Sequence, residues 1–294
     1  MNYRISHVTT YSYREAVSLC QNVAHLAPRE CAWQRAAPHV LSITPDPAVI
    51  EERIDFFGNP VQYFTIQEPH RELTVKVEHL IAVDPRPLPA TTDAWESVRD
   101  RLRINRSKDW LDALPFAFAS RYVPLDDRYA AHAAASFTPD RPILEAALDL
   151  TKRIHAEFAY DPQATTLATP VAEVFEKKRG VCQDFAHLQL AMLRSLGLAA
   201  QYVSGYLQTI TPPGQERLTG ADATHAWVRL FCGDAGWIDL DPTNDLVPGD
   251  RHVWLAWGRD YEDVSPLKGV ILGGGAHSVQ VAVDVVPVPA DEPI

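Results

Sequence analysis

Apolar and polar residues alternate through the first 83 residues, which is the period of a strand with one buried face. The alternation is clear from Tyr3 to Tyr11, and residues 71–83 are rich in β-branched side chains. Between these segments, Gly58-Asn59 separates two strand-like runs and suits a tight turn, because both residues tolerate positive φ. We therefore expect an N-terminal antiparallel β domain over residues 1–85.

Three prolines fall within residues 84–92, a composition that disfavours helix interiors and central strands. A domain boundary is expected there. Residues 93–140 show weaker periodicity, although the run WESVRDRLRI within them fits one amphipathic helix. We interpret residues 86–140 as a connector.

Helical periodicity begins after Pro142, where four apolar residues fall near one face: Leu144, Leu148, Ile154 and Phe158. A second helix is marked at both ends. Thr169 is a candidate cap, Pro170 suits the first helical position, and Gly180 suits the end. Residues 177–179 are basic and complement the negative end of the helix dipole.

A third helix is expected to start at Cys182 and to stop at Gly197, with apolar residues at three-to-four spacing: Phe185, Leu188, Met192 and Leu196. Four strand-like segments follow, at 199–210, 225–232, 237–242 and 277–286. The pattern predicts an α+β core domain over residues 141–294, with helices first and an antiparallel sheet, including C-terminal strands, afterwards.

The expected start of this helix gives Cys182 a chemical role. A thiol is a nucleophile as thiolate, and the N–H groups and dipole at a helix N-terminus favour that charge. Cysteine hydrolases add an imidazole base that is oriented by a carboxylate or amide. His225 and Asp241 are the candidates for these two roles.

The register of one hairpin decides whether His225 and Asp241 can meet. A five-residue loop at 232–236 pairs Phe231 with Trp237 and makes His225 and Asp241 diagonal neighbours on one face. A four-residue loop places them on opposite faces. Asp239 shares the face of Asp241, so parity alone does not choose between the two carboxylates.

Composition narrows the function classes. A formal charge of −11 argues against nucleic-acid binding, which relies on clustered lysine and arginine. The four cysteines form no CxxC pair and no zinc-finger spacing, so neither a disulfide scaffold nor a zinc module is expected. We expect no metal and no other cofactor. No apolar stretch approaches the ~20 residues of a membrane helix, and the opening residues do not resemble a signal peptide. We expect a cytoplasmic protein with no membrane partner.

Three motifs resemble the core of bacterial transglutaminase-like proteins of the candidate cysteine protease type: RGVCQDFAHLQLAMLRSLGLAAQYVSGYL, then THAWVRL, then WIDLDPTND. HVTTYSY at 7–13 and FFGNPVQYF at 56–64 are similar to that family's N-terminal β domain, and residues 251–270 are similar to its tail. The resemblance implies a papain/transglutaminase-like core in which Cys182, His225 and Asp241 form the catalytic triad. It thereby favours Asp241 over Asp239.

The resemblance implies a cysteine hydrolase, a protease or amidase, that acts through a thioester acyl-enzyme on peptide or carboxamide bonds. A peptide or protein substrate is expected. Hydrolysis is favoured because the sequence shows no evident acidic funnel for an amine and no D-x-D-x-D-G calcium loop. An amine-incorporating acyltransferase (protein-glutamine transglutaminase) and a non-catalytic binding scaffold are the alternatives.

Four further residues are candidates near the site. The developing oxyanion needs donors besides the backbone N–H of Cys182, and Tyr160 and Gln183 are the candidates. Trp227 and Tyr206 either line the cleft or pack in the core.

Overall fold

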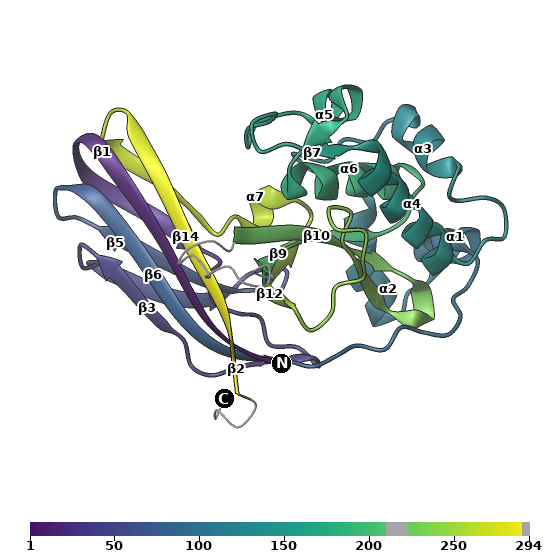
Figure 1. Cartoon of the computed structure of the whole chain (residues 1–294), viewed down its shortest axis with the longest axis horizontal. Coiled ribbons are helices and arrows are strands. Elements are labelled where there is room, and N and C mark those ends of the chain that lie inside the picture. The colour runs from purple at the N-terminus through teal and green to yellow at the C-terminus, as the bar shows by residue number, and fades with distance from the viewer. Residues whose placement is uncertain (210–222, 290–294) are drawn as a thin grey trace, which may run out of the picture.

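The structure, a computed structural model, describes residues 1–209 and 223–289 (Figure 1). Ile210, the last residue of the strand expected at 199–210, lies outside these ranges. Eight strands form a first antiparallel sheet: β1 (Asn2–Ala24), β2 (Gln34–Ala36), β3 (Val40–Thr44), β4 (Val49–Ile54), β5 (Pro60–Ile66), β6 (His70–Val83), β13 (Leu267–Gly273) and β14 (His277–Val288). Tyr3 and Ile5 are fully buried, as the alternation predicts. The expected N-terminal antiparallel sheet is confirmed.

The long strand β1 is central to this sheet because its two halves have different neighbours. Residues 2–12 pair with β6 and β14, whereas residues 20–24 pair with β5 and β13. The strands β13 and β14 therefore belong to the first sheet, although the sequence suggested that they belong to the core domain. They cover an edge of β1 that would otherwise expose unpaired backbone N–H and C=O groups.

The hairpin between β4 and β5 has a longer turn than Gly58-Asn59 alone suggested. Its loop comprises residues 55–59, with Gly58 at φ 78°. The Asp55 carboxylate accepts the backbone N–H of Phe57 and of Asn59, each at 2.8 Å. A carboxylate that satisfies the N–H groups of its own loop explains why the turn spans five residues.

Residues 93–140 are helical and belong to the core, so the expected connector is much shorter. They form α1 (Trp95–Ile104), α2 (Lys108–Ala113), the 3₁₀ turn η1 (Leu114–Ala117) and α3 (Asp127–Ala134). The run WESVRDRLRI is helix α1, as its amphipathic pattern indicated. Trp95, Trp110 and Tyr129 from these elements are buried in one cluster with Phe185 and Leu188. Burial of large aromatic side chains offsets the weak periodicity of this segment.

The three helices expected after residue 142 are α4 (Ile143–Glu157), α5 (Val171–Lys177) and α6 (Cys182–Ser195). The ends of α5 differ from expectation, because Pro170 is the N-cap and Lys178 takes the left-handed conformation, with φ 55°. Thr169 does not cap α5; its hydroxyl accepts the backbone N–H of Thr166. None of the helices in the described residues is long and apolar enough to cross a membrane.

A second antiparallel sheet has the strand order β11 (Trp237–Leu240), β10 (Ala223–Phe231), β9 (Ala200–Leu207), β12 (His252–Gly258). Short elements complete the core: β7 (Ala159–Tyr160), β8 (Arg179–Gly180), η2 (Gly233–Ala235) and α7 (Tyr261–Val264). Figure 1 shows the second sheet between the helices and the long strands of the first sheet. The α+β class is confirmed.

Two buried clusters hold the second sheet in place. On one side, Val228 and Leu230 of β10 pack in the same cluster as α6. A separate cluster joins side chains of both sheets: Tyr3, Ile5, Ile81, Val83, Val283 and Val285 from the first, and Val203, Tyr206, Trp227, Val253, Trp254 and Leu255 from the second. Burial of this apolar surface links the N-terminal sheet directly to the strand that carries His225.

Candidate active site

Cys182 is the first residue of α6, as the sequence predicted, and its side chain is partly exposed. The helix start is held by Asp184, whose carboxylate accepts the N–H of Val181 at 2.8 Å and the hydroxyl of Thr165 at 2.6 Å. A Cβ on Gly180 would lie 2.6 Å from Oδ2 of Asp184. Glycine at 180 therefore serves the turn that presents Cys182, rather than the end of α5.

His225 and Asp241 meet across the predicted hairpin. Phe231 pairs with Trp237, which confirms the register of the five-residue loop. Nε2 of His225 lies 2.7 Å from Oδ2 of Asp241, and both side chains are buried. Asp241 itself lies just after β11 ends, where its backbone forms an isolated bridge with Leu246. Strand pairing thus brings the two residues together, and the following turn holds the carboxylate.

Five hydrogen bonds surround the Asp241 carboxylate. Oδ1 accepts the backbone N–H of Thr243 at 2.9 Å and of Asn244 at 3.2 Å. Oδ2 accepts Nδ2 of Asn244 at 2.7 Å and contacts Nε2 of His225 at 2.7 Å and of His252 at 3.2 Å. Burial alone would raise the pKa of Asp241, but the bonds to His225, His252 and Asn244 hold it well below its usual range. The carboxylate is ionised at neutral pH.

The electrostatics of His225 favour the charged imidazolium. Burial opposes this charge, but hydrogen bonds and Coulomb attraction to Asp241 and Cys182 outweigh burial and raise the pKa of His225 to about 10. Since Asp241 occupies Nε2, the ring nitrogen that remains for Cys182 is Nδ1. An imidazolium next to a sulfur stabilises thiolate, the reactive form of cysteine.

Asp239, the competing carboxylate, is buried in a different network. Its Oδ1 accepts the indole N–H of Trp227 and of Trp254, each at 2.9 Å. Its Oδ2 contacts Arg86 and, at 3.5 Å, Nε of Arg229. Asp239 therefore pairs with two arginines and accepts the N–H groups of two indoles, so it has a structural role in the core.

Of the two aromatic candidates, Trp227 supports His225 and Tyr206 lies away from it. Trp227 is fully buried and its ring stacks on that of His225, with centroids 6.0 Å apart and planes at 28°. Tyr206 is also fully buried, and its hydroxyl pairs with Nδ1 of His7 in the first sheet at 2.9 Å. Both residues pack in the cluster between the sheets, so neither forms an open cleft wall.

Tyr160 and Gln183, the candidates for the second oxyanion donor, flank the cysteine. Tyr160 is 58% exposed, and its short strand β7 pairs with β8, where it lies opposite Gly180. Burial, and to a lesser extent the charge of Cys182, raise the pKa of Tyr160. Gln183 is the second residue of α6 and is half-buried. Tyr160 lines a cavity of about 390 Å³ together with Phe185 of α6 and Thr243, among others, whereas Cys182 and Gln183 do not line it.

The second histidine on Asp241 was missed by sequence reasoning. His252 begins β12, a strand that the sequence assigned only to a family-like tail. The run VWLAW after it is a strand signal that would have indicated a pleated position for His252. Ligand atoms of His225, Asp241 and His252 lie within 4.8 Å of one another, a spacing that a divalent ion can use. Hydrogen bonds from both histidines to Oδ2 of Asp241, at 2.7 and 3.2 Å, account for this proximity without an ion.

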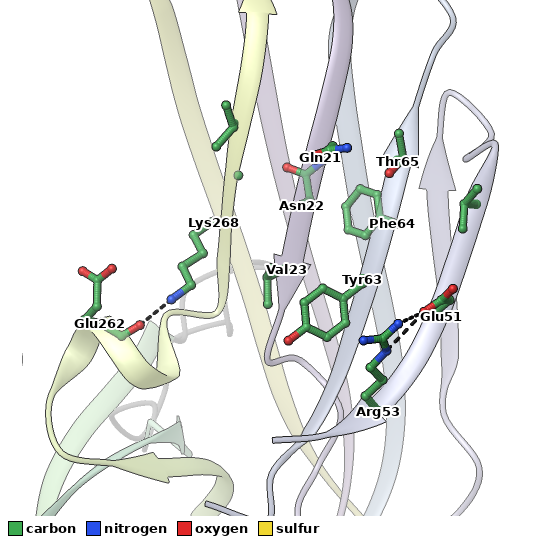
Figure 2. A pocket seen from close by; sticks show the side chains of 13 residues that line it. Gln21, Asn22, Val23, Glu51, Arg53, Tyr63, Phe64, Thr65, Glu262 and Lys268 are labelled. Atoms are coloured by element: carbon green, nitrogen blue, oxygen red, sulfur yellow. Dashed lines mark hydrogen bonds and ion pairs between the residues drawn. The ribbon is translucent and has the colours of Figure 1, made fainter. Parts of the chain in front are cut away.

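A larger cavity lies on the first sheet, away from these residues. Figure 2 shows it between β1, β5, β4 and β13, with Tyr63 and the ion pair of Arg53 and Glu51 on one side and Lys268 on the other. Its volume is about 670 Å³. None of Cys182, His225 and Asp241 lines it.

A cysteine at a helix start, with a histidine on one strand and an aspartate just after the neighbouring strand, is typical of the class of transglutaminase-like folds. Residues 3–105 match the model of the bacterial transglutaminase-like N-terminal region, and residues 130–242 match the model of the transglutaminase-like superfamily. The chain belongs to this family of bacterial transglutaminase-like proteins.

Two of the similar proteins match this chain over nearly its whole length. An uncharacterized protein of Mycobacterium tuberculosis is 40% identical over 305 residues, covering 98% of this chain and 94% of the relative. A crystal structure of a candidate cysteine protease from Cytophaga hutchinsonii superimposes with a TM-score of 0.76 at 22% identity, covering 100% of this chain and 92% of that one. A protein-glutamine gamma-glutamyltransferase of Pseudomonas aeruginosa is 30% identical over 99 residues, which are 31% of this chain and 15% of that enzyme.

Proposed function

We propose that this protein is a cysteine hydrolase, a protease or amidase, with Cys182 as nucleophile, His225 as general acid and base, and Asp241 as the residue that orients His225. The main support for this proposal is the hydrogen bond between His225 and Asp241. Asp241 holds Nε2 at 2.7 Å, so the ring turns Nδ1 toward Cys182 and stays protonated there at neutral pH.

In the first step, the Cys182 thiolate attacks the carbonyl carbon of a peptide or carboxamide bond. Negative charge then develops on the carbonyl oxygen. The backbone N–H of Cys182 has no partner within its helix because it is the first helical residue, and it is the proposed donor to this oxygen. Collapse of the intermediate breaks the C–N bond, His225 gives its Nδ1 proton to the leaving amine, and a thioester remains on Cys182.

In the second step, water attacks the thioester while His225 takes one of its protons on Nδ1. The C–S bond breaks, the carboxylic acid leaves, and the thiolate and imidazolium are restored. The cavity lined by Tyr160, Phe185 and Thr243 is the proposed place for the substrate chain, since it adjoins both the cysteine helix and the Asp241 turn. The Tyr160 hydroxyl is the proposed second oxyanion donor, with Gln183 as the alternative.

A second candidate function is an acyltransferase that incorporates amines. The segment similarity to the Pseudomonas protein-glutamine gamma-glutamyltransferase favours it, and the first step is the same. A non-catalytic scaffold is a third candidate. The cavity of Figure 2 favours a binding role for the first sheet, because it is open, partly apolar and separate from Cys182.

One experiment distinguishes the three functions. Wild type and Cys182→Ala are incubated with a bacterial lysate and an isotope-labelled primary amine, and the products are read by mass spectrometry as cut sites, deamidated side chains and amine adducts. Cys31→Ser is the matched control, because Cys31 is the other partly exposed thiol among the described residues.

The hydrolase proposal expects cut or deamidated products with wild type and Cys31→Ser and none with Cys182→Ala. Amine adducts that require Cys182 would establish the transferase instead. Identical product lists for wild type and Cys182→Ala would leave the scaffold as the remaining function.

A further inference from the structure

His252 shares with His225 the carboxylate oxygen on which the proposed site depends. Its Nε2 lies 3.2 Å from Oδ2 of Asp241, and its side chain is 2% exposed. A carboxylate accepts hydrogen bonds, so this contact requires a proton on Nε2 of His252. Nδ1 of His252 has no hydrogen-bond partner within the described part of the chain, which fits a bare lone pair rather than a buried N–H donor.

Asp241 needs support from outside its own turn. The strand β11 ends at Leu240, so the ladder with β10 no longer holds the backbone of Asp241. Oδ1 is held by the next turn, through the N–H groups of Thr243 and Asn244. Besides His225 on the neighbouring strand β10, His252 donates to Oδ2 from β12, which lies on the opposite edge of the second sheet from β11.

The strand that carries His252 is itself clamped by the first sheet. Gln34 accepts the backbone N–H of Trp254 at 2.8 Å and donates to the carbonyl of Trp254 at 2.7 Å. Asn59 accepts the N–H of Trp257 at 3.0 Å and donates to its carbonyl at 2.9 Å. The N-terminal domain therefore fixes the strand of His252 from one side, while pairing with β9 fixes it from within the second sheet.

Aromatic packing restricts the His252 ring further. The ring of Trp227 meets it edge to face, with centroids 5.3 Å apart, and the same Trp227 stacks on His225. Trp227 thus fixes the two imidazoles relative to each other while both point Nε2 at Asp241.

We propose that His252 is a positioning residue of the site, which donates Nε2–H to Asp241 and holds this carboxylate in line with His225 from the side of the N-terminal domain. The inference rests on the proposed function, in which Asp241 orients His225. It gives the first sheet a part in the chemistry, since Gln34 and Asn59 fix the strand on which His252 lies.

The test compares two substitutions in a Cys31→Ser background, which leaves Cys182 as the partly exposed thiol of the described residues. His252→Gln keeps an N–H donor at the end of the side chain, whereas His252→Leu removes it. The rate of Cys182 alkylation by iodoacetamide at pH 7 is measured, together with the spectrum of the ring N–H groups in protein that carries ¹⁵N-labelled histidine. Thermal unfolding checks that each variant is folded.

We expect alkylation to fall about 10-fold or more in His252→Leu, the size typical for loss of a partner that orients a functional group, and to return to within about 3-fold of wild type in His252→Gln. The His225 Nε2–H resonance should shift in His252→Leu and be retained in His252→Gln. If His252 acted through packing alone, both variants would lower the alkylation rate, whether or not the new side chain carries an N–H donor. That result would overturn the proposal.

The wild-type spectrum keeps the proposal testable if His252→Leu does not fold. It should show His252 neutral and protonated on Nε2 at pH 7; protonation on Nδ1 instead would overturn the positioning role. His225→Gln separates the two proposals. If it leaves Cys182 alkylation unchanged, the proposed function fails, whereas a loss in His225→Gln with no change in His252→Leu refutes the role of His252 alone.

Discussion

Trp227 donates its indole N–H to Asp239 over 2.9 Å, and this bond gives a structural role to the carboxylate nearest Asp241 in sequence. The two aspartates share one face of the hairpin but serve different partners. Asp239 meets Arg86 and Arg229, whereas Asp241 meets His225. Strand alternation places both aspartates on the same face, so it does not distinguish them. Their hydrogen-bond partners do.

Substitution of each aspartate by asparagine should affect a different property of the protein, stability for Asp239 and turnover for Asp241. Asp239→Asn removes a buried charge from two arginines, so we expect the free energy of unfolding in urea to fall by about 3–5 kcal/mol. Asp241→Asn should stay folded but lower turnover by roughly 10⁴, the loss seen when a triad aspartate no longer sets the histidine tautomer. Equal effects of the two variants on turnover, measured with each protein fully folded, would contradict this division.

Stability should depend on pH through His225. Its pKa is raised from an ordinary 6.5 to about 10, so the folded state binds a proton that the unfolded state releases. The stabilisation is complete below pH 6.5 and is lost as pH rises toward 10, at about 1.4 kcal/mol for each pH unit. The free energy of unfolding of wild type, measured relative to His225→Gln, should therefore decrease between pH 7 and pH 10. A constant difference over that range would refute the charged imidazole.

Local patterns predicted the elements that present the site. The three-to-four spacing from Phe185 to Leu196 placed Cys182 at a helix start, and the five-residue loop placed His225 beside Asp241. Both predictions rest on contacts close in sequence. The choice of Asp241 over Asp239 came from motif resemblance, because each side chain lies on the same strand face.

Long-range pairing was beyond the sequence. Residues 277–286 show a strand pattern, but nothing local indicates that β13 and β14 pair with β1, more than 240 residues earlier in the chain. His252 is only 11 residues from Asp241, but their contact depends on the order of the second sheet, in which β11 and β12 lie at opposite edges. The helices after residue 104 were hidden because buried Trp110 and Tyr129 stabilise short helices through tertiary packing, which periodicity does not report.

Trp227, which stacks on His225, should tolerate only glycine at residue 205. A Cβ there would lie 2.1 Å from the carbonyl oxygen of Val253 and 2.5 Å from Cη2 of Trp227. Gly205→Ala should therefore push Trp227 against His225 and lower the free energy of unfolding by at least about 1–3 kcal/mol. Gly249→Ala is the matched control, since its Cβ would meet nothing within 4 Å, and it should change stability by less than about 1 kcal/mol. Urea unfolding of both variants measures the contrast; similar losses would contradict it.

Two tyrosines offer a final contrast between chemistry and packing. Tyr206→Phe removes the hydroxyl that pairs with buried His7, so we expect unfolding to become easier by about 1–3 kcal/mol while turnover of the folded protein is unchanged. Tyr160→Phe removes an exposed hydroxyl near Cys182, so stability should stay within about 0.5 kcal/mol of wild type. Turnover should then fall by about 10²-fold or more if that hydroxyl donates to the oxyanion, as one such donor typically contributes. Unchanged turnover in Tyr160→Phe would instead transfer the donor role to Gln183, which Gln183→Leu would test by the same measurement.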